Sequence, residues 1–163
     1  MKTQVLSNRK VDLAYEPHLL QQQAYKDLGE RLDTLSPESQ ALWGKMDVAQ
    51  MMAHVTANLE MAMSEEKVTQ EFLGRIFGSF AKRQTLTKGL SKNVPGGART
   101  KISDPRAFEK EKETLRLQLE HFVRSGEAGI TQQPHDFFGR MTDNEWARLQ
   151  YVHLEHHFEQ FGV

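Results

Sequence analysis

Two histidines four residues apart near the C-terminus are the side chains of this sequence most suited to chemistry. The segment 146–161 reads W-A-R-L-Q-Y-V-H-L-E-H-H-F-E-Q-F and holds three of the seven histidines, His153, His156 and His157. On a helix, His153 and His157 lie on one face, about one turn apart. Neutral imidazole nitrogens bind zinc and similar ions, so the pair predicts part of a metal site. A solvated helix face and a hydrogen-bonded core pair are the alternatives.

A third ligand is expected from another helix, because catalytic metal sites often combine three protein ligands with one open position. His54 is the best candidate, since it lies mid-helix at the edge of an apolar stripe that runs from Val48 to Ala62. A lone histidine in such a place can instead be a core residue with satisfied hydrogen bonds. His18, near a helix start, and His121, in a charged helix, are expected to be more exposed.

Helical spacing favours His157 over His156 as the second ligand from the last helix. His157 continues the row that holds Gln150 and His153, with Gln160 one turn further on. Amides at this spacing can orient ligand rings by hydrogen bonds, although many are simply surface residues.

Three amides and two tryptophans are candidates for supporting roles. Asn58 lies one turn beyond His54 and could orient it, as Gln150 and Gln160 could for the other rings. Trp43 and Trp146 are expected either to line a pocket or to belong to the core.

The hydrophobic periodicity predicts an all-α fold. Apolar residues recur every three or four positions, and no segment alternates as a strand would. Asp47, Asp104-Pro105 and the capping box Thr142-x-x-Glu145 mark expected helix starts. The expected helices cover 17–33, 48–64, a shorter glycine-containing segment at 70–87, 105–125 and 146–161.

The regions between and before these helices complete one predicted domain over residues 1–163. Residues 1–14 are expected to be a loosely ordered lead-in. Gly74 and Gly78 weaken the helical pattern of the shorter segment and could permit a close backbone approach. A long basic loop is expected from Gly89 to Lys101.

Composition excludes several classes of function. The 163 residues are 38% hydrophobic and 26% charged, which is typical of a soluble globular chain. The net charge of -1 predicts no nucleic-acid or membrane partner, although residues 74–108 hold eight Lys or Arg and one acid. The absence of cysteine excludes disulfides, thiolate ligands and a cysteine nucleophile. Without an apolar leader or a run of about 18 apolar residues, the cytoplasm is the expected location.

Several motifs together resemble one family. The blocks W-G-K-M, A-Q-M-M-A-H, F-F-G-R-M-T-x-x-E-W and H-x-x-H-H-x-x-Q-F-G lie between Trp43 and Gly162. They resemble the DinB-like (YfiT-like) metal-binding four-helix bundle superfamily, and within it a largely uncharacterised branch. The resemblance implies an up-down-down-up bundle, often dimeric, that holds zinc or nickel through three histidines. The matching positions are His54, His153 and His157.

One segment departs from the pattern of that branch. The branch tends to show H-P-x-F-G before the last helix, whereas this chain has His135-Asp136-Phe137-Phe138-Gly139 and lacks the proline. His135 could point at the open side of the metal, or it could cap or pack within its own loop.

The resemblance implies a thiol-dependent transferase or isomerase. A metal with an open position can hold a small thiol, such as mycothiol, bacillithiol or glutathione, as the nucleophilic thiolate. The chain has no cysteine, so the thiol would be a cosubstrate. The basic stretch from Arg75 to Lys101 could attract carboxylates of that thiol, or it could be a solvated loop.

Two alternatives to this enzyme stay open. One is a metal-hydroxide hydrolase, for which the sequence places no carboxylate general base. The other is a non-catalytic, metal-containing binding or stress-response module. In each case the expected partners are a small molecule and a second copy of the chain.

Overall fold

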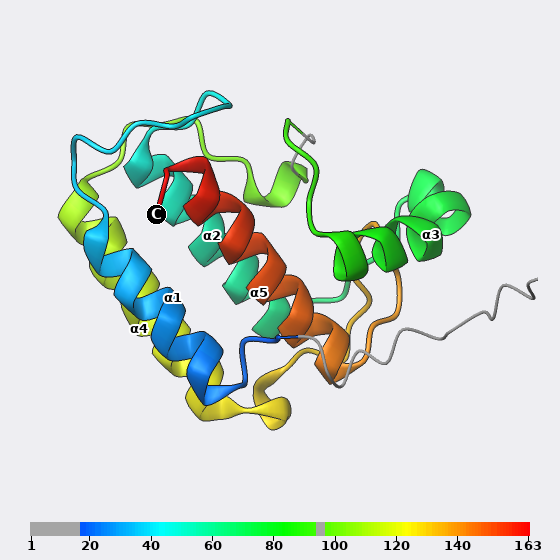
Figure 1. Ribbon diagram of the computed structural model, residues 1–163. Helices are drawn as coiled ribbons and strands as arrows, with labels where there is room; N and C mark the ends of the chain where they lie inside the picture. The colour runs from blue at the N-terminus through cyan, green and yellow to red at the C-terminus, as the bar shows by residue number, and fades with distance from the viewer. Residues whose placement is uncertain (1–16, 94–96) are drawn as a thin grey trace, which may run out of the picture.

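The computed structural model describes residues 17–93 and 97–163, and within these ranges it is all-helical without strands. The predicted lead-in at 1–14 and part of the V-P-G-G motif lie outside the described residues. Within the described ranges, five α-helices and two 3-10 turns follow one another (Figure 1). Their bounds are α1 Gln22–Thr34, α2 Val48–Met63, α3 Phe72–Lys88, η2 Ala98–Thr100, α4 Phe108–Ser125, η3 Glu127–Gly129 and α5 Asp143–Gln160.

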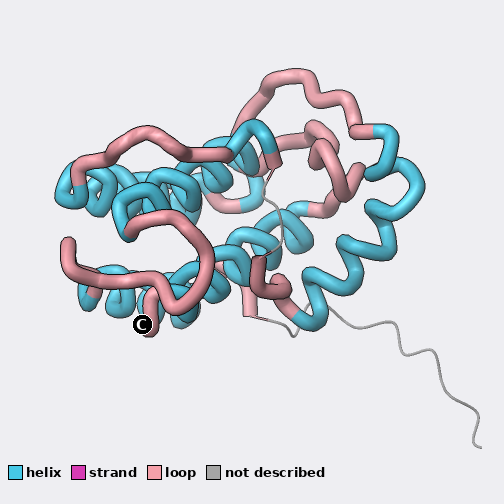
Figure 2. The backbone as a smooth tube through the Cα atoms, turned by 90° about the horizontal axis from the view of Figure 1, so that it is seen from above, coloured by secondary structure: helices cyan, strands magenta, loops and turns pink. Residues whose placement is uncertain are grey.

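Four helices, α1, α2, α4 and α5, surround one hydrophobic core, and α3 lies to the side of them (Figures 1 and 2). The apolar stripes of the four helices supply this core, as their helical periodicity requires. Trp146, Phe122 and Phe158 are the largest side chains that are fully buried in it. The chain therefore brings α2 and α5, which carry the histidines, into direct contact inside the protein.

Local sequence signals explain where α2 and α5 begin. Asp47 accepts a hydrogen bond from the backbone N–H of Gln50, whose side chain accepts one from the N–H of Asp47. Thr142 and Glu145 form the same reciprocal capping box at the start of α5. Both predicted N-caps are confirmed. Such caps satisfy N–H groups that a helix start otherwise leaves without partners.

Two other predicted helix starts are wrong by a few residues. Helix α1 begins at Gln22 instead of Pro17, because the carbonyl of Pro17 accepts a hydrogen bond from Arg148 and Leu19 N–H donates to α5. Helix α4 begins at Phe108 instead of Pro105. Long-range bonds thus compete with the local cap signals.

Asp104 shows the same competition at the start of α4. Its carboxylate pairs with Arg106, and its carbonyl accepts a hydrogen bond from the side chain of Gln50 on α2. The carboxylate caps no helix N–H, since the N-cap of α4 is Ala107. Residues 104–107 are consequently an extended approach to the helix.

The glycine-containing segment predicted at 70–87 forms a complete helix, not a minor helical piece. Helix α3 has 17 residues, about as many as α2 and α4. A Cβ added at Gly74 or Gly78 would lie 2.4 or 2.3 Å from the carbonyl oxygen of Phe137. The predicted close backbone approach is confirmed: α3 rests on the 135–139 loop through its two glycines.

No helix in the described ranges is long and apolar enough to cross a membrane.

Candidate metal centre

The three histidines singled out by spacing come together in the interior. His54 lies on α2, and His153 and His157 lie one turn apart on α5. All three are buried, and each offers a nitrogen atom within 4.8 Å of those of the others. The Nε2 atom of His153 lies 3.0 Å from Nε2 of His54 and 3.2 Å from Nε2 of His157. The remaining candidates, His135 and His156, are outside this cluster.

These separations suit one metal ion. A tetrahedral ion with metal–nitrogen bonds of about 2.0–2.1 Å holds its ligand nitrogens about 3.3–3.4 Å apart. The two Nε2–Nε2 distances are only slightly shorter, so small side-chain shifts would admit an ion at the centre.

The ring of His54 is oriented by the backbone of η2. Its Nδ1 lies 2.7 Å from the carbonyl oxygen of Thr100. A carbonyl only accepts hydrogen bonds, so Nδ1 of His54 carries the proton and Nε2 keeps its lone pair. The lone pair points at the cluster. Sequence reasoning missed Thr100, because any residue type can supply a backbone carbonyl.

The ring of His157 is oriented by a relay of two hydrogen bonds. Gln160 donates from Nε2 to the carbonyl of Trp43 at 2.6 Å, and its Oε1 accepts from Nδ1 of His157 at 2.8 Å. His157 therefore also directs the lone pair of Nε2 into the cluster. Of the three predicted orienting amides, Gln160 contacts a histidine ring, whereas Asn58 donates to the backbone carbonyl of His54. Within residues 17–93 and 97–163, no hydrogen bond joins Gln150 to a histidine ring.

Hydrogen bonds alone leave this cluster unsatisfied. His153 faces two Nε2 atoms that both present lone pairs, and its single Nε2 proton can serve only one of them. The Nδ1 atom of His153 is buried and has no hydrogen-bond partner among the described residues. A metal ion at the centre would engage all three lone pairs. The donor set consequently fits a divalent ion better than it fits a hydrogen-bonded core triad.

Burial keeps the three rings neutral, as ligands must be. Desolvation lowers the pKa of His54, and it lowers the pKa of His157 to about 3 with help from the charge of His54. Desolvation, followed by the charges of the other two rings, holds the pKa of His153 well below its usual range. At neutral pH no proton competes for these nitrogens.

His156 and His135 take other places beside the cluster. His156 is half-buried, and its ring packs edge-on against Trp43 with centroids 5.7 Å apart. His135 accepts hydrogen bonds at Nδ1 from the backbone N–H groups of Phe137 and Phe138, at 3.1 and 3.2 Å. It thus caps its own loop, and its ring also lies 5.4 Å from that of Trp146.

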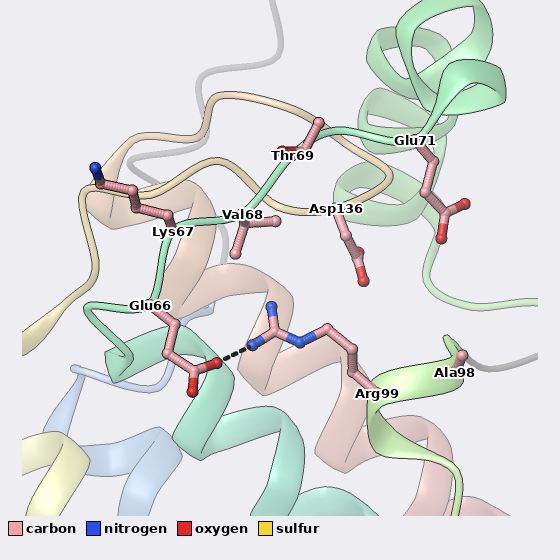
Figure 3. A pocket seen from close by; sticks show the side chains of 8 residues that line it. All are labelled: Glu66, Lys67, Val68, Thr69, Glu71, Ala98, Arg99 and Asp136. Carbon is pink, nitrogen blue, oxygen red and sulfur yellow. Dashed lines mark hydrogen bonds and ion pairs between the residues drawn. The ribbon is translucent and has the colours of Figure 1, made fainter.

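A pocket of about 380 Å³ lies next to this region (Figure 3). Arg99, whose neighbour Thr100 holds His54, extends along its floor and pairs with Glu66 at 2.8 Å. Asp136, the neighbour of His135, points into it from the opposite loop. The remaining lining residues are Lys67, Val68, Thr69, Glu71 and Ala98.

The comparison with protein families gives one match. The model of a family described as "Protein of unknown function (DUF1569)" matches residues 14–162. The chain belongs to the DUF1569 family. A search of curated proteins and a search of solved structures each found no match. The part matched by the DUF1569 model includes His54, Thr100, His153, His157 and Gln160, so the whole candidate centre lies within the family region.

Proposed function

We propose that this DUF1569 protein is a divalent-metal-dependent enzyme of the transferase or isomerase type. In this proposal His54, His153 and His157 hold zinc or nickel, and a small thiol binds at the open position. The observation that carries the proposal is the convergence of three buried Nε2 atoms, two of them fixed as lone-pair donors by Thr100 and Gln160.

The finer structural assignment belongs to the same proposal. The motifs of the histidine helices support membership of the DinB-like superfamily, with its up-down-down-up order of helices and its homodimers. The arrangement of α1, α2, α4 and α5 around one core is compatible with that bundle.

A bound divalent ion would supply Lewis acidity, which lowers the pKa of a coordinated thiol and favours its nucleophilic form. The residues of the chain orient the ligand rings and exclude water. Thr100 and Gln160 keep two rings in one tautomer and one orientation, as supporting groups do in metal sites. Trp146 and the core behind α5 exclude water from one side. The thiol must come from outside, because the chain has no cysteine.

The pocket beside η2 supports a small-molecule substrate. Arg99 is the group in it that suits a carboxylate, since guanidinium binds carboxylates through paired hydrogen bonds. Its ion pair with Glu66 is exposed to solvent and can exchange for a ligand. The wider basic stretch is partly neutralised within the protein, because Lys82 pairs with Glu145 and Arg106 with Glu111.

Metal analysis followed by cobalt substitution tests the proposal. The purified protein should contain about one tightly bound divalent ion per chain, and His153→Ala or His157→Ala should lose it while keeping helicity. Glutathione or 2-mercaptoethanol should shift the visible spectrum of the cobalt form. Protein that binds no divalent ion would contradict the metal site. Cobalt protein that responds to no thiol would contradict the thiol chemistry and favour the hydrolase or the non-catalytic module.

A further inference from the structure

The outer face of α3 is the largest apolar feature that the described protein leaves uncovered. Five large side chains on this helix are 56–75% exposed: Phe72, Leu73, Ile76, Phe77 and Phe80. Their spacing places them on one side of the helix, and Gly74 and Gly78 on the other side rest on the loop. Figure 1 shows α3 projecting from the side of the four core helices. We call these five side chains the α3 face.

The size of the α3 face matches half of a dimer interface. Five side chains of this size and exposure leave on the order of 600 Å² uncovered, which is the upper end for a patch on a monomer. Two such patches together bury about 1,200 Å², where specific protein–protein interfaces begin. A second copy of the chain could therefore cover the patch with an area sufficient for association.

The order of residues in the α3 face makes it self-complementary. Phe72, Ile76 and Phe80 form a row at intervals of four residues, with Ile76 at its centre. When two copies of this row run antiparallel about a two-fold axis at Ile76, each Phe72 meets Phe80 of the partner subunit. The two Ile76 side chains meet each other.

Charge selects the antiparallel arrangement. Helix α3 carries Arg75, Lys82, Arg83 and Lys88 and no acidic residue, while its N-cap is Glu71. Lys82 already pairs with Glu145 on α5, so parallel pairing would set Arg83 and Lys88, which flank the α3 face, against their own copies. Antiparallel pairing instead separates the two copies of Arg83, and those of Lys88, along the helix axis.

Charge also disfavours an anionic membrane as the occupant. Residues 74–108 have a net charge of +7, so the rest of the chain carries -8. Lys82, Arg99 and Arg106 of this stretch already pair with acidic side chains outside it, so its attraction for an anionic surface is weaker than the charge of +7 indicates. We propose that the α3 face pairs with the α3 face of a second copy, antiparallel about Ile76. This inference is independent of the metal centre and assigns a surface to the predicted homodimer.

Sedimentation of a matched pair of variants tests the proposal. The wild type should sediment at about twice the chain mass of 18.7 kDa at micromolar concentration. Ile76→Asp should weaken the dimer Kd by at least ~100-fold, because it buries a charge in the interface. Leu117→Asp replaces an equally exposed leucine on α4 and should stay dimeric. A monomeric wild type, or an Ile76→Asp dimer as tight as the wild type, would overturn the proposal.

Single cysteines in this cysteine-free chain test the geometry. Oxidised Ile76→Cys should form a disulfide-linked dimer, because the two copies of residue 76 meet. Phe72→Cys should not, since antiparallel copies of residue 72 lie about 12 Å apart along the helix, beyond disulfide reach. Cross-linking of Phe72→Cys and not Ile76→Cys would contradict the arrangement. Monomeric protein that co-sediments with phosphatidylserine vesicles would assign the α3 face to lipid and refute the dimer.

Discussion

At the scale of single residues, Gly44 supports His157 indirectly, through Gln160. Gly44 follows Trp43, whose carbonyl anchors Gln160, and Gly44 has φ of +85°. A Cβ at Gly44 would lie 2.5 Å from Nε2 of Gln160. A side chain at position 44 must therefore displace the amide that orients the metal ligand, a role that the motif W-G-K-M does not reveal by itself.

We predict that Gly44→Ala weakens metal affinity by about 10-fold, the usual scale for loss of an orienting group. Gly89→Ala is the matched control, because Gly89 has φ of +82° and open space at its Cβ. Both variants strain the backbone similarly, but only the first disturbs Gln160. Competition with a chelator measures the affinity. Equal losses in the two variants would show that backbone strain, and not Gln160, is responsible.

The depressed pKa of His157 predicts the pH dependence of the metal-free protein. The folded pKa is about 3, whereas an unfolded chain has the ordinary value of 6.5. Below pH 6.5 the unfolded state binds a proton that the folded state does not. The free energy of unfolding should fall from about pH 6.5 toward 3, by up to about 1.4 kcal/mol per pH unit for each such histidine.

Urea unfolding of the metal-free protein across this pH range measures the effect. His157→Gln removes one titrating group while keeping a polar side chain of similar size. Its free energy of unfolding should decline less steeply with falling pH than that of the wild type. An identical slope would mean that His157 titrates normally in the folded protein.

At the scale of elements, Gly74 and Gly78 allow α3 to pack closely against the 135–139 loop. A Cβ added at Gly78 would lie 2.3 Å from the carbonyl oxygen of Phe137, so a side chain at position 78 would not fit here. The loop is further tied to the start of α3 by Glu71 N–H, which donates to Asp136, and by Gln70, which donates to Phe137. Since Asp136 belongs to this loop, α3 helps to position one wall of the pocket beside the candidate centre.

We predict that Gly78→Ala destabilises the protein by about 1–3 kcal/mol, the usual cost of overpacking against an unyielding backbone. Gly29→Ala in α1 should instead stabilise it by up to about 1 kcal/mol, because a Cβ there meets nothing within 4 Å and alanine favours a helix. Equilibrium unfolding in urea measures both changes. Stabilisation by both substitutions would refute the close approach of α3 to the loop.

At the scale of the whole molecule, the candidate centre joins α2 to α5 across the core. A ligand that binds only the folded state adds RT ln(1 + [L]/Kd) to the free energy of unfolding. We predict that zinc or nickel at 100 times its Kd adds about 2.7 kcal/mol and raises the Tm accordingly. His153→Ala should abolish this gain.

Thermal melts of the metal-free and metal-loaded protein measure the gain. His121→Ala is the control, because His121 is exposed on α4 and lies away from the cluster. It should respond to metal as the wild type does. A metal-induced rise in Tm that survives His153→Ala would place the ion elsewhere.

The sequence by itself determined the helical class and the residues that meet. The 3.6-residue period puts His153 and His157 on one face of α5, and the apolar stripe beside His54 turns it inward. The capping boxes at Asp47 and Thr142 involve neighbours in sequence, so local chemistry decides them. All these features depend on contacts within a few residues.

Only the tertiary structure decided what holds the histidines and where α3 lies. Thr100 and Trp43 act through backbone carbonyls, which carry no signal of residue type. Helices α1 and α4 begin later than predicted, because Arg148 donates a hydrogen bond to Pro17 and Gln50 donates one to Asp104 across the fold. Gly74 and Gly78 indicate a close backbone approach, but only the fold shows that Phe137 is the neighbour. Contacts between distant segments depend on the packing of the whole chain, which helical periodicity does not encode.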